Sequence, residues 1–363
     1  MTGPAVRHAA LTWLEARLYV AAAFVVSHAV FAQTGPRTTV APFERGLFAW
    51  DGDWYLRIAE QGYLNADDPS VRFFPLFPLL SRWLGWLIGT EPALILLANG
   101  AALLAGIALY HLTMQETGDP VIAQRTTRLM ALFPVGFVLV LAYSEGLFLA
   151  LSILVFLCLR SRRWWTAALL AFLAGLTRPV AGILALPALY HAVRNRHQLR
   201  QRPVAALGAG LTVLAAPAGT LTFLLWSRMA LGNTWAPVEQ QELLRGRTSE
   251  PLSRLWHAFN EGIRGDEGEL FHFFAAIAII ALAVAAVRLL SADLCLYVVP
   301  SVIFIIASDN LNSMERYALG AFPLLIVAGL LSRKVSIGSW LPTVSAVAMT
   351  SICVLALSGA YVP

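Results

Sequence analysis

The sequence has little charge, few cysteines and almost no lysine. Charged residues make up 13% of its 363 residues and hydrophobic residues 58%, whereas soluble globular domains are about 25% charged. Its three cysteines stand apart without a C-x-x-C spacing, which indicates neither a disulfide framework nor a thiolate metal site. The scarcity of charge, together with a mean hydropathy of +0.68, excludes a soluble domain and predicts a membrane protein.

Several chemical motifs are also missing. The sequence has no Walker-type or G-x-G-x-x-G phosphate loop, and its seven histidines show no H-E-x-x-H spacing. Nucleotide-powered chemistry is therefore not expected. The first apolar run lacks the small-residue cleavage site of a signal peptide. The net charge of +5 would suggest a nucleic-acid partner in a soluble protein, but in a membrane protein the distribution of charge across the membrane matters more.

Apolar runs recur along the chain, and several reach the roughly 20 residues that a membrane-crossing helix needs. The sequence therefore predicts an all-α polytopic membrane protein that forms one domain over residues 1–363. The expected spans are 15–33, 92–112, 126–142, 145–159, 203–229, 269–288, 293–307, 317–332 and 340–361.

The loops between these spans alternate in charge. Most acids fall in two long loops, 34–91 and 230–268, and in a short one at 308–316. The positive-inside rule places the arginine-rich loops in the cytoplasm and the acidic loops outside the plasma membrane, with the N-terminus inside and the C-terminus outside. The basic loop residues are Arg7, Arg17, Arg125, Arg128, Arg160, Arg162, Arg163, Arg194, Arg196, Arg200, Arg202, Arg288, Arg333 and Lys334.

One segment breaks the alternation, because basic clusters stand at both of its ends. Residues 166–192 are too few for two full spans, and Arg178 and Pro179 lie at their centre between Gly175 and Gly182. A proline beside glycines is where a helix breaks. The pattern predicts a re-entrant pair of half-helices whose turn lines a cavity.

The stretch LFAWDGDWYLRIAEQGY at 47–63 puts two acids into an aromatic cluster. We expect Asp53 to cap a helix that ends at Gly62 and lies in the outer interface, followed by a second interfacial helix within 72–89. Asp51 and Asp53 either cap and solvate a turn or have a catalytic role, and their apolar, aromatic setting favours the catalytic role. Three other charged residues have equally open interpretations: Glu145 caps a helix or acts as a second acid, Arg178 bonds loose carbonyls or binds an anion, and Arg316 snorkels or binds an anion.

The motifs WDGDWYLRIAEQGY, FFPLFPLL, LFPVGFVLVLAYSEGLFLAL, AGLTRPVAGIL and RYALGAFPLL, within about 45–330, occur in the order and spacing of a known family. The chain resembles the GPI mannosyltransferase 2 family (glycosyltransferase family 76), which has bacterial members and belongs to the GT-C superfamily. The resemblance implies a GT-C-like helical bundle with an outward-facing cavity, a catalytic acid in the first outer loop and a polyprenyl-phosphate-linked sugar donor. The family's Trp-Asp falls on Trp50 and Asp51, and its middle outer loop matches loosely at Trp235, Gln240 and Arg247.

The resemblance and the residues together favour an inverting mannosyltransferase. Asp51 is the expected general base, Asp53 and Glu145 are candidate second acids, and Arg316 and then Arg178 are the expected ligands of the donor phosphate. No metal is expected to be obligatory, although two acids could hold Mg²⁺ or Mn²⁺. The acceptor is a glycan, a lipid or a protein. The residues expected to line the substrate are Trp50, Trp54, Tyr55, Tyr143 and Tyr317.

Two other function classes remain open. A polyprenyl-linked sugar flippase also needs broken helices and polar groups in the membrane, but it would typically show two related halves. The sequence shows no repeat between 1–180 and 181–363. A non-catalytic membrane partner is the third hypothesis.

Overall fold

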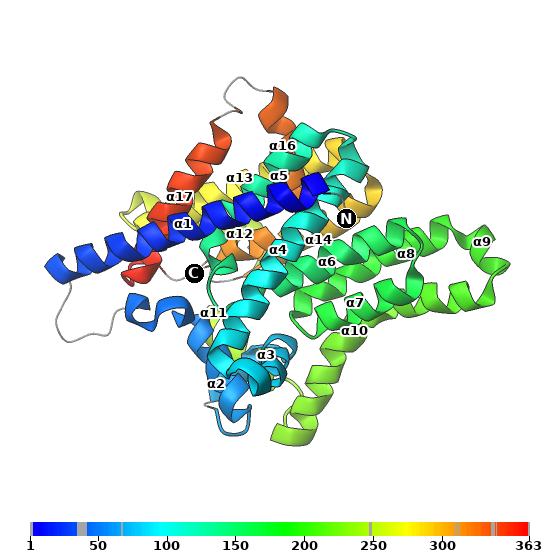
Figure 1. Cartoon of the computed structure of the whole chain (residues 1–363), viewed down its shortest axis with the longest axis horizontal. Helices are drawn as coiled ribbons and strands as arrows, with labels where there is room; N and C mark the ends of the chain where they lie inside the picture. Colours follow the sequence, from blue (N-terminus) through cyan, green and yellow to red (C-terminus); the bar gives the residue numbers. More distant parts are fainter. Residues whose placement is uncertain are drawn as a thin grey trace. The chain divides into compact units, whose positions relative to one another are not determined.

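The computed structural model describes residues 3–34, 42–66, 68–246, 249–308, 311, 313–334, 338 and 340–361. Regular structure within these residues consists of α-helices joined by short 3₁₀ helices (Figure 1). The predicted all-α fold is confirmed. The chain divides into two compact units, of which the first comprises Met1–Ala66, Phe77–Ala150 and Ala328–Pro363 and the second Asp67–Leu76 and Leu151–Val327. The single-domain organisation stays a prediction.

The first unit is built on long apolar helices. Helix α1 packs against α4 and α17, and α4 packs against α5. Its elements are α1 (Gly3–Thr34), η1 (Pro42–Phe48), α2 (Asp51–Gln61), α3 (Leu76–Ile88, from Phe77 on), α4 (Thr90–Thr117), α5 (Pro120–Ala131), η3 (Gly136–Leu139), the first residues of α6 (Glu145–Arg160), the last residues of α16 (Pro323–Lys334) and α17 (Leu341–Leu357).

The second unit carries the remaining helices, and in Figure 1 the green α7, α8 and α10 run side by side. Its elements are η2 (Asp68–Arg72), the rest of α6, α7 (Trp164–Gly175), η4 (Pro179–Leu184), α8 (Ala185–Arg194), α9 (Arg196–Arg200), α10 (Pro203–Leu231), α11 (Ala236–Arg245), α12 (Pro251–Ile263), α13 (Glu267–Leu289), α14 (Ala292–Ile306), α15 (Met314–Gly320) and the start of α16.

Four helices in the described part of the chain are long and apolar enough to cross a membrane: Gly3–Val30, Thr90–Thr117, Pro203–Leu231 and Glu267–Leu289. They make the protein a multi-pass membrane protein. The helices at 76–88, 164–175, 292–306 and 341–357 are apolar but shorter, so their depth in the bilayer is not fixed by length alone.

Two of the expected spans are wrong as continuous helices. The run 126–142 stops being helical after Ala131, and the run 317–332 bends by 86° between α15 and α16. Pro134 and Pro323 explain both breaks, because proline lacks a backbone N–H and disfavours helical geometry in the residue before it.

The irregular segment after α5 has its carbonyl groups satisfied by side chains from three helices. Arg17 donates to the Leu139 carbonyl at 3.0 Å, Asn99 to that of Val140 at 2.9 Å, and Ser345 to that of Leu132 at 2.7 Å. Non-helical backbone among membrane helices is tolerated when protein groups bond it in this way. The segment is thereby fixed, and it delivers the turn at Tyr143.

The expected break at Arg178 and Pro179 is present. Helix α7 ends at Gly175, η4 begins at Pro179, and α8 follows from Ala185. Two short helices therefore flank a turn, as predicted; their re-entrant placement stays a prediction. Helix α7 packs closely on α10, because a Cβ on Gly175 would lie 2.1 Å from the Ala216 carbonyl oxygen. Small residues permit such close contacts between membrane helices.

Candidate functional site

The aspartate motif lies on the turn formed by Tyr143 and Ser144. The Tyr143 hydroxyl accepts a hydrogen bond from the Asp51 backbone N–H at 3.1 Å, and the Tyr55 and Ser144 hydroxyls are 2.7 Å apart. Both tyrosines are buried, while Asp51 is half-buried. The structure thus brings together the two motifs that the sequence offered separately.

Gly52 makes this approach possible. A Cβ at this position would lie 3.3 Å from the Leu47 carbonyl oxygen and 3.6 Å from the Cβ of Ala142. The Ala142 N–H also donates to the Leu47 carbonyl at 2.9 Å. The glycine between the two aspartates therefore lets the start of α2 sit directly on the chain that leads to Tyr143.

Helix α2 begins at Asp51, so the expected N-cap at Asp53 is wrong. Trp50 is the N-cap, and its backbone has φ 59° and ψ −119°, with no side-chain cap. A non-glycine residue in this region costs about 1–3 kcal/mol and persists only where the surroundings impose it. The indole N–H of Trp50 donates to the Ala356 carbonyl at 2.9 Å, which fixes the strained residue and with it Asp51.

The two aspartates have different surroundings. Both carboxylate oxygens of Asp53 lie near arginines, one 2.9 Å from Arg57 and the other 3.6 Å from Arg45. Asp53 therefore fits the role of an ion-pair partner better than that of a metal ligand or second acid. Arg57 also lies over the Trp54 ring, 5.4 Å from its centroid. Trp54 therefore packs beside the ion pair of Asp53 and Arg57.

Glu145 is buried and begins α6, where a carboxylate is favoured by the helix dipole. The helix start is packed tightly, because a Cβ on Gly146 would lie 2.8 Å from the Ala98 carbonyl oxygen of α4. The helix-terminal position that the sequence indicated for Glu145 is confirmed. Its role as an acid stays a prediction.

Arg178 and Arg316 converge on one aromatic ring in the second unit. Their guanidinium carbons lie 5.6 Å and 5.5 Å from the centroid of the Tyr317 ring. Arg316 is 5% exposed, and Arg178 is half-buried at the turn between α7 and η4. Guanidinium groups suit anions with several oxygens, such as a phosphate, so these two arginines are the candidate phosphate ligands of this unit.

A buried histidine–glutamate pair stands next to Arg316. His272 Nδ1 lies 2.8 Å from a Glu315 carboxylate oxygen, and both side chains are buried. The pair ties α13 to the short helix that carries Arg316. Sequence reasoning missed it because a single histidine shows no spacing motif, although an ionisable residue near the start of an apolar span is itself a functional signal.

A second buried cluster joins α6, α8 and α14. Asp293 lies 3.0 Å from Arg160 and 3.1 Å from His191, and the Ser291 hydroxyl donates to it at 2.6 Å. Of these residues, Arg160 was assigned to the basic face from the sequence, and its pairing with Asp293 was not predicted. The cluster neutralises the charges where three helix ends meet, which is how buried charges are accommodated.

Two of the three loosely matched residues of the middle outer loop lie at helix α11. Trp235 precedes α11 and is 58% exposed, and Gln240 lies within α11. Arg247 lies outside the described residues. Within the described part of the chain, no three His, Cys, Asp or Glu side chains gather in a way that could hold a metal ion.

The helices and the Trp-Asp motif define a multi-pass membrane protein with a carboxylate beside an aromatic turn. Residues 37–199 match a family model described as mannosyltransferase (PIG-V). This stretch contains the Trp-Asp, Tyr-Ser-Glu and Arg-Pro motifs. The resemblance of the chain to the GPI mannosyltransferase 2 family is thereby confirmed.

Curated relatives agree with this match. The GPI alpha-1,6-mannosyltransferase 2 of Cricetulus griseus is 33% identical over 163 residues, which cover 40% of this chain and 31% of the relative. The protein of the same name from Mus musculus is 32% identical with the same coverage, and that from Homo sapiens is 28% identical over 245 residues, 61% of this chain and 46% of the relative. The chain matches a third to a half of the length of these relatives.

Proposed function

We propose that the protein is an inverting glycosyltransferase that moves mannose from a polyprenyl-phosphate donor to an acceptor hydroxyl outside the plasma membrane. The observation that carries the proposal is the placement of Asp51. It is the first residue of α2, its N–H bonds Tyr143, and the strained residue before it is anchored on Ala356. The family match over 37–199 supplies the sugar chemistry.

The proposed reaction needs one carboxylate. The leaving group is a phosphate that is already anionic, so no acid has to protonate it, in contrast to the carboxylate pair of glycoside hydrolysis. The acceptor oxygen bonds to the anomeric carbon as the bond from that carbon to the phosphate oxygen breaks. The bonding pair leaves with the phosphate, and the hydroxyl proton passes to Asp51. Attack from the side opposite the phosphate inverts the anomeric carbon.

The arginine site suits the departing phosphate. Arg316 and Arg178, held on Tyr317, would stabilise the charge that accumulates on its oxygens. The scheme routes no step through a divalent metal, because the two arginines take the part of stabilising the phosphate charge. These residues act by binding and orienting the donor, whereas Asp51 moves the proton.

The decisive experiment uses the full-length protein in proteoliposomes with labelled polyprenyl-phosphate mannose and a panel of alcohol acceptors. Asp51→Asn should lower transfer by about 10²- to 10⁴-fold, which is the usual contribution of a general base. Donor binding should persist. Transfer at the wild-type rate would remove Asp51 as the base, and translocation of the donor headgroup without a new glycosidic bond would favour a flippase.

A further inference from the structure

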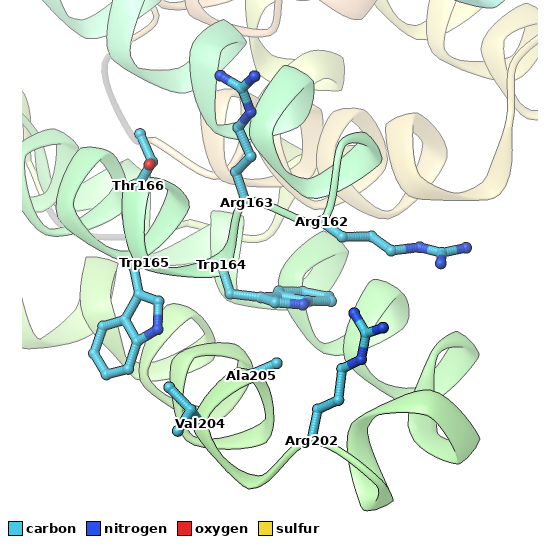
Figure 2. Close-up of a pocket in the computed structure, with 8 residues that line it drawn as sticks. All are labelled: Arg162, Arg163, Trp164, Trp165, Thr166, Arg202, Val204 and Ala205. Atoms are coloured by element: carbon cyan, nitrogen blue, oxygen red, sulfur yellow. The ribbon is translucent and has the colours of Figure 1, made fainter.

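An open hollow lies where α6 turns into α7, beside the start of α10. It encloses about 470 Å³ and is lined by Arg162, Arg163, Trp164, Trp165, Thr166, Arg202, Val204 and Ala205. Figure 2 shows the Arg202 side chain rising toward Trp164, while Trp165 lies against Val204 on the other side. None of these residues takes part in the proposed transfer.

The hollow is strongly cationic. The sequence has no aspartate or glutamate between Glu145 and Glu239, and the nearby Asp293 of α14 is paired with Arg160 and His191. Arg162 donates to the side-chain oxygen of Gln198, a neutral group. Within the described part of the chain, none of Arg162, Arg163 and Arg202 is ion-paired with a carboxylate. An anion from outside the protein would complement their charge.

The two tryptophans bear on where the hollow lies relative to the membrane surface. Trp164 is buried, and the Thr212 hydroxyl donates to its carbonyl at 2.9 Å. Trp165 is 49% exposed and packs near Gly208, where a Cβ would lie 3.2 Å from its indole nitrogen. Tryptophan is enriched at the membrane–water interface. The hollow also lies at the first residues of α10, a candidate membrane span.

An apolar stripe continues from the hollow along α10. Its exposed residues recur at helical spacing, and Leu169 of α7 is exposed as well. The stripe residues are Val204, Leu207, Leu211, Leu214, Leu221 and Leu225. A ligand with a phosphate at one end and hydrocarbon chains at the other would match the cationic hollow and the stripe together.

We propose that this hollow binds the phosphate headgroup of an anionic membrane phospholipid. Arg162 and Arg202 hold the phosphate, and Arg163, whose side chain points away from them, adds positive charge nearby (Figure 2). Trp165 packs on the glycerol region, and the acyl chains follow the first part of the apolar stripe of α10, from Val204 to Leu214. Such a lipid would anchor the ends of α7 and α10 at the basic face of the membrane. The site is separate from the residues proposed for mannosyl transfer.

The test measures binding of a dansyl-labelled phosphatidylglycerol to full-length protein in neutral phosphatidylcholine nanodiscs, by energy transfer from tryptophan. The triple variant R162Q/R163Q/R202Q should bind the lipid about 10- to 100-fold more weakly, because each arginine near an anionic lipid contributes appreciably. The matched control R194Q/R196Q/R200Q removes the same charge from the neighbouring α8 and α9 segment and should bind within about threefold of wild type.

Three outcomes would overturn the proposal. Equal loss in both triple variants would show a diffuse attraction to the basic face, and unchanged binding in the hollow variant would show that the hollow is not the site. Competition by inorganic phosphate as strong as that by unlabelled phosphatidylglycerol would show a soluble-anion site. Helical content and the unfolding midpoint of each variant show whether it has folded. If the triple variant does not fold, the single variant W165A, which leaves all arginines in place, takes its place in the test and is expected to bind the lipid more weakly than wild type.

Discussion

Asp51 and Asp53 are separated by one glycine, yet their carboxylates meet different surroundings. The oxygens of Asp53 lie near Arg57 and Arg45, and its side chain is 22% exposed. Asp51 is the residue that the strained backbone of Trp50 and the hydroxyl of Tyr143 position. The structure therefore distinguishes Asp51, the candidate base, from Asp53, the candidate ion-pair residue. The sequence alone did not distinguish them.

Asp53→Asn is expected to lower mannosyl transfer by less than about fivefold. The Arg57 pair is partly exposed, and exposed ion pairs contribute about 0.2–1 kcal/mol. Steady-state transfer rates of Asp53→Asn and Asp51→Asn, measured side by side in proteoliposomes, check this. A loss at Asp53 as large as that at Asp51 would contradict the distinction and restore the two-acid hypothesis.

Tyr317 is expected to position the donor phosphate through the two arginines on its ring. Tyr317→Leu removes both contacts, each of which is worth about 0.5–2 kcal/mol, so the KM for the donor should rise while kcat changes little. Tyr317→Phe keeps the ring and should behave as wild type. Initial rates over a donor series measure both quantities, and an equal effect of the two variants would point to the hydroxyl instead.

At the residue scale, sequence reasoning found most of the residues that the structure gathers into the two sites. The aromatic setting of Asp51 and the helix break at Arg178 were visible as patterns. The strain at Trp50 was not, because no residue pattern predicts a positive φ for tryptophan. The pairing of His272 with Glu315 depends on how α13 and α15 pack, and a single sequence gives no signal for such long-range contacts.

At the scale of elements, the contact of α7 with α10 depends on two glycines that face each other. A Cβ on Gly219 would lie 2.2 Å from the Phe172 carbonyl oxygen, and one on Gly175 would meet the Ala216 carbonyl oxygen. No side-chain rotation can relieve a collision with backbone. The helices would have to move apart, and the turn at Arg178 that follows α7 would move with them.

Gly219→Ala is therefore expected to destabilise the protein by about 1–3 kcal/mol, the usual cost of overpacking. Gly210 lies on the same helix with nothing near its missing Cβ, so Gly210→Ala is the matched control and should be neutral or stabilising by up to about 1 kcal/mol. Thermal unfolding midpoints in one detergent compare the two. Equal midpoints for the two variants would show that α7 and α10 are not held at this distance.

Sequence patterns predicted helix types better than helix limits. Hydrophobic runs gave the long helices α4, α10 and α13, and Gly62 ends α2 with φ 75° as expected. The prolines at 134 and 323 lie inside apolar runs, and their effect was underestimated. Hydropathy averages over a window and does not register one missing N–H, whereas the backbone does.

At the scale of the whole molecule, charge is distributed so that membrane orientation can be tested without any knowledge of the reaction. The stretch from Glu145 to Glu239 contains arginines and no acids between those two residues, while the loop around α12 carries several acids. A membrane protein keeps arginine-rich short loops in the cytoplasm. The loop at Ser161 should therefore be cytoplasmic and helix α12 outside.

Single cysteines at these places should react from opposite sides of the membrane. Ser161 and His257 are exposed, so S161C and H257C can be introduced after Cys158, Cys295 and Cys353 are replaced by alanine. A membrane-impermeant maleimide should label H257C in intact cells and S161C only after permeabilisation. Labelling of S161C in intact cells would reverse the orientation. It would then place the arginine-lined hollow outside and, because one inverted topology moves every loop, would also shift the proposed transfer to the cytoplasmic face.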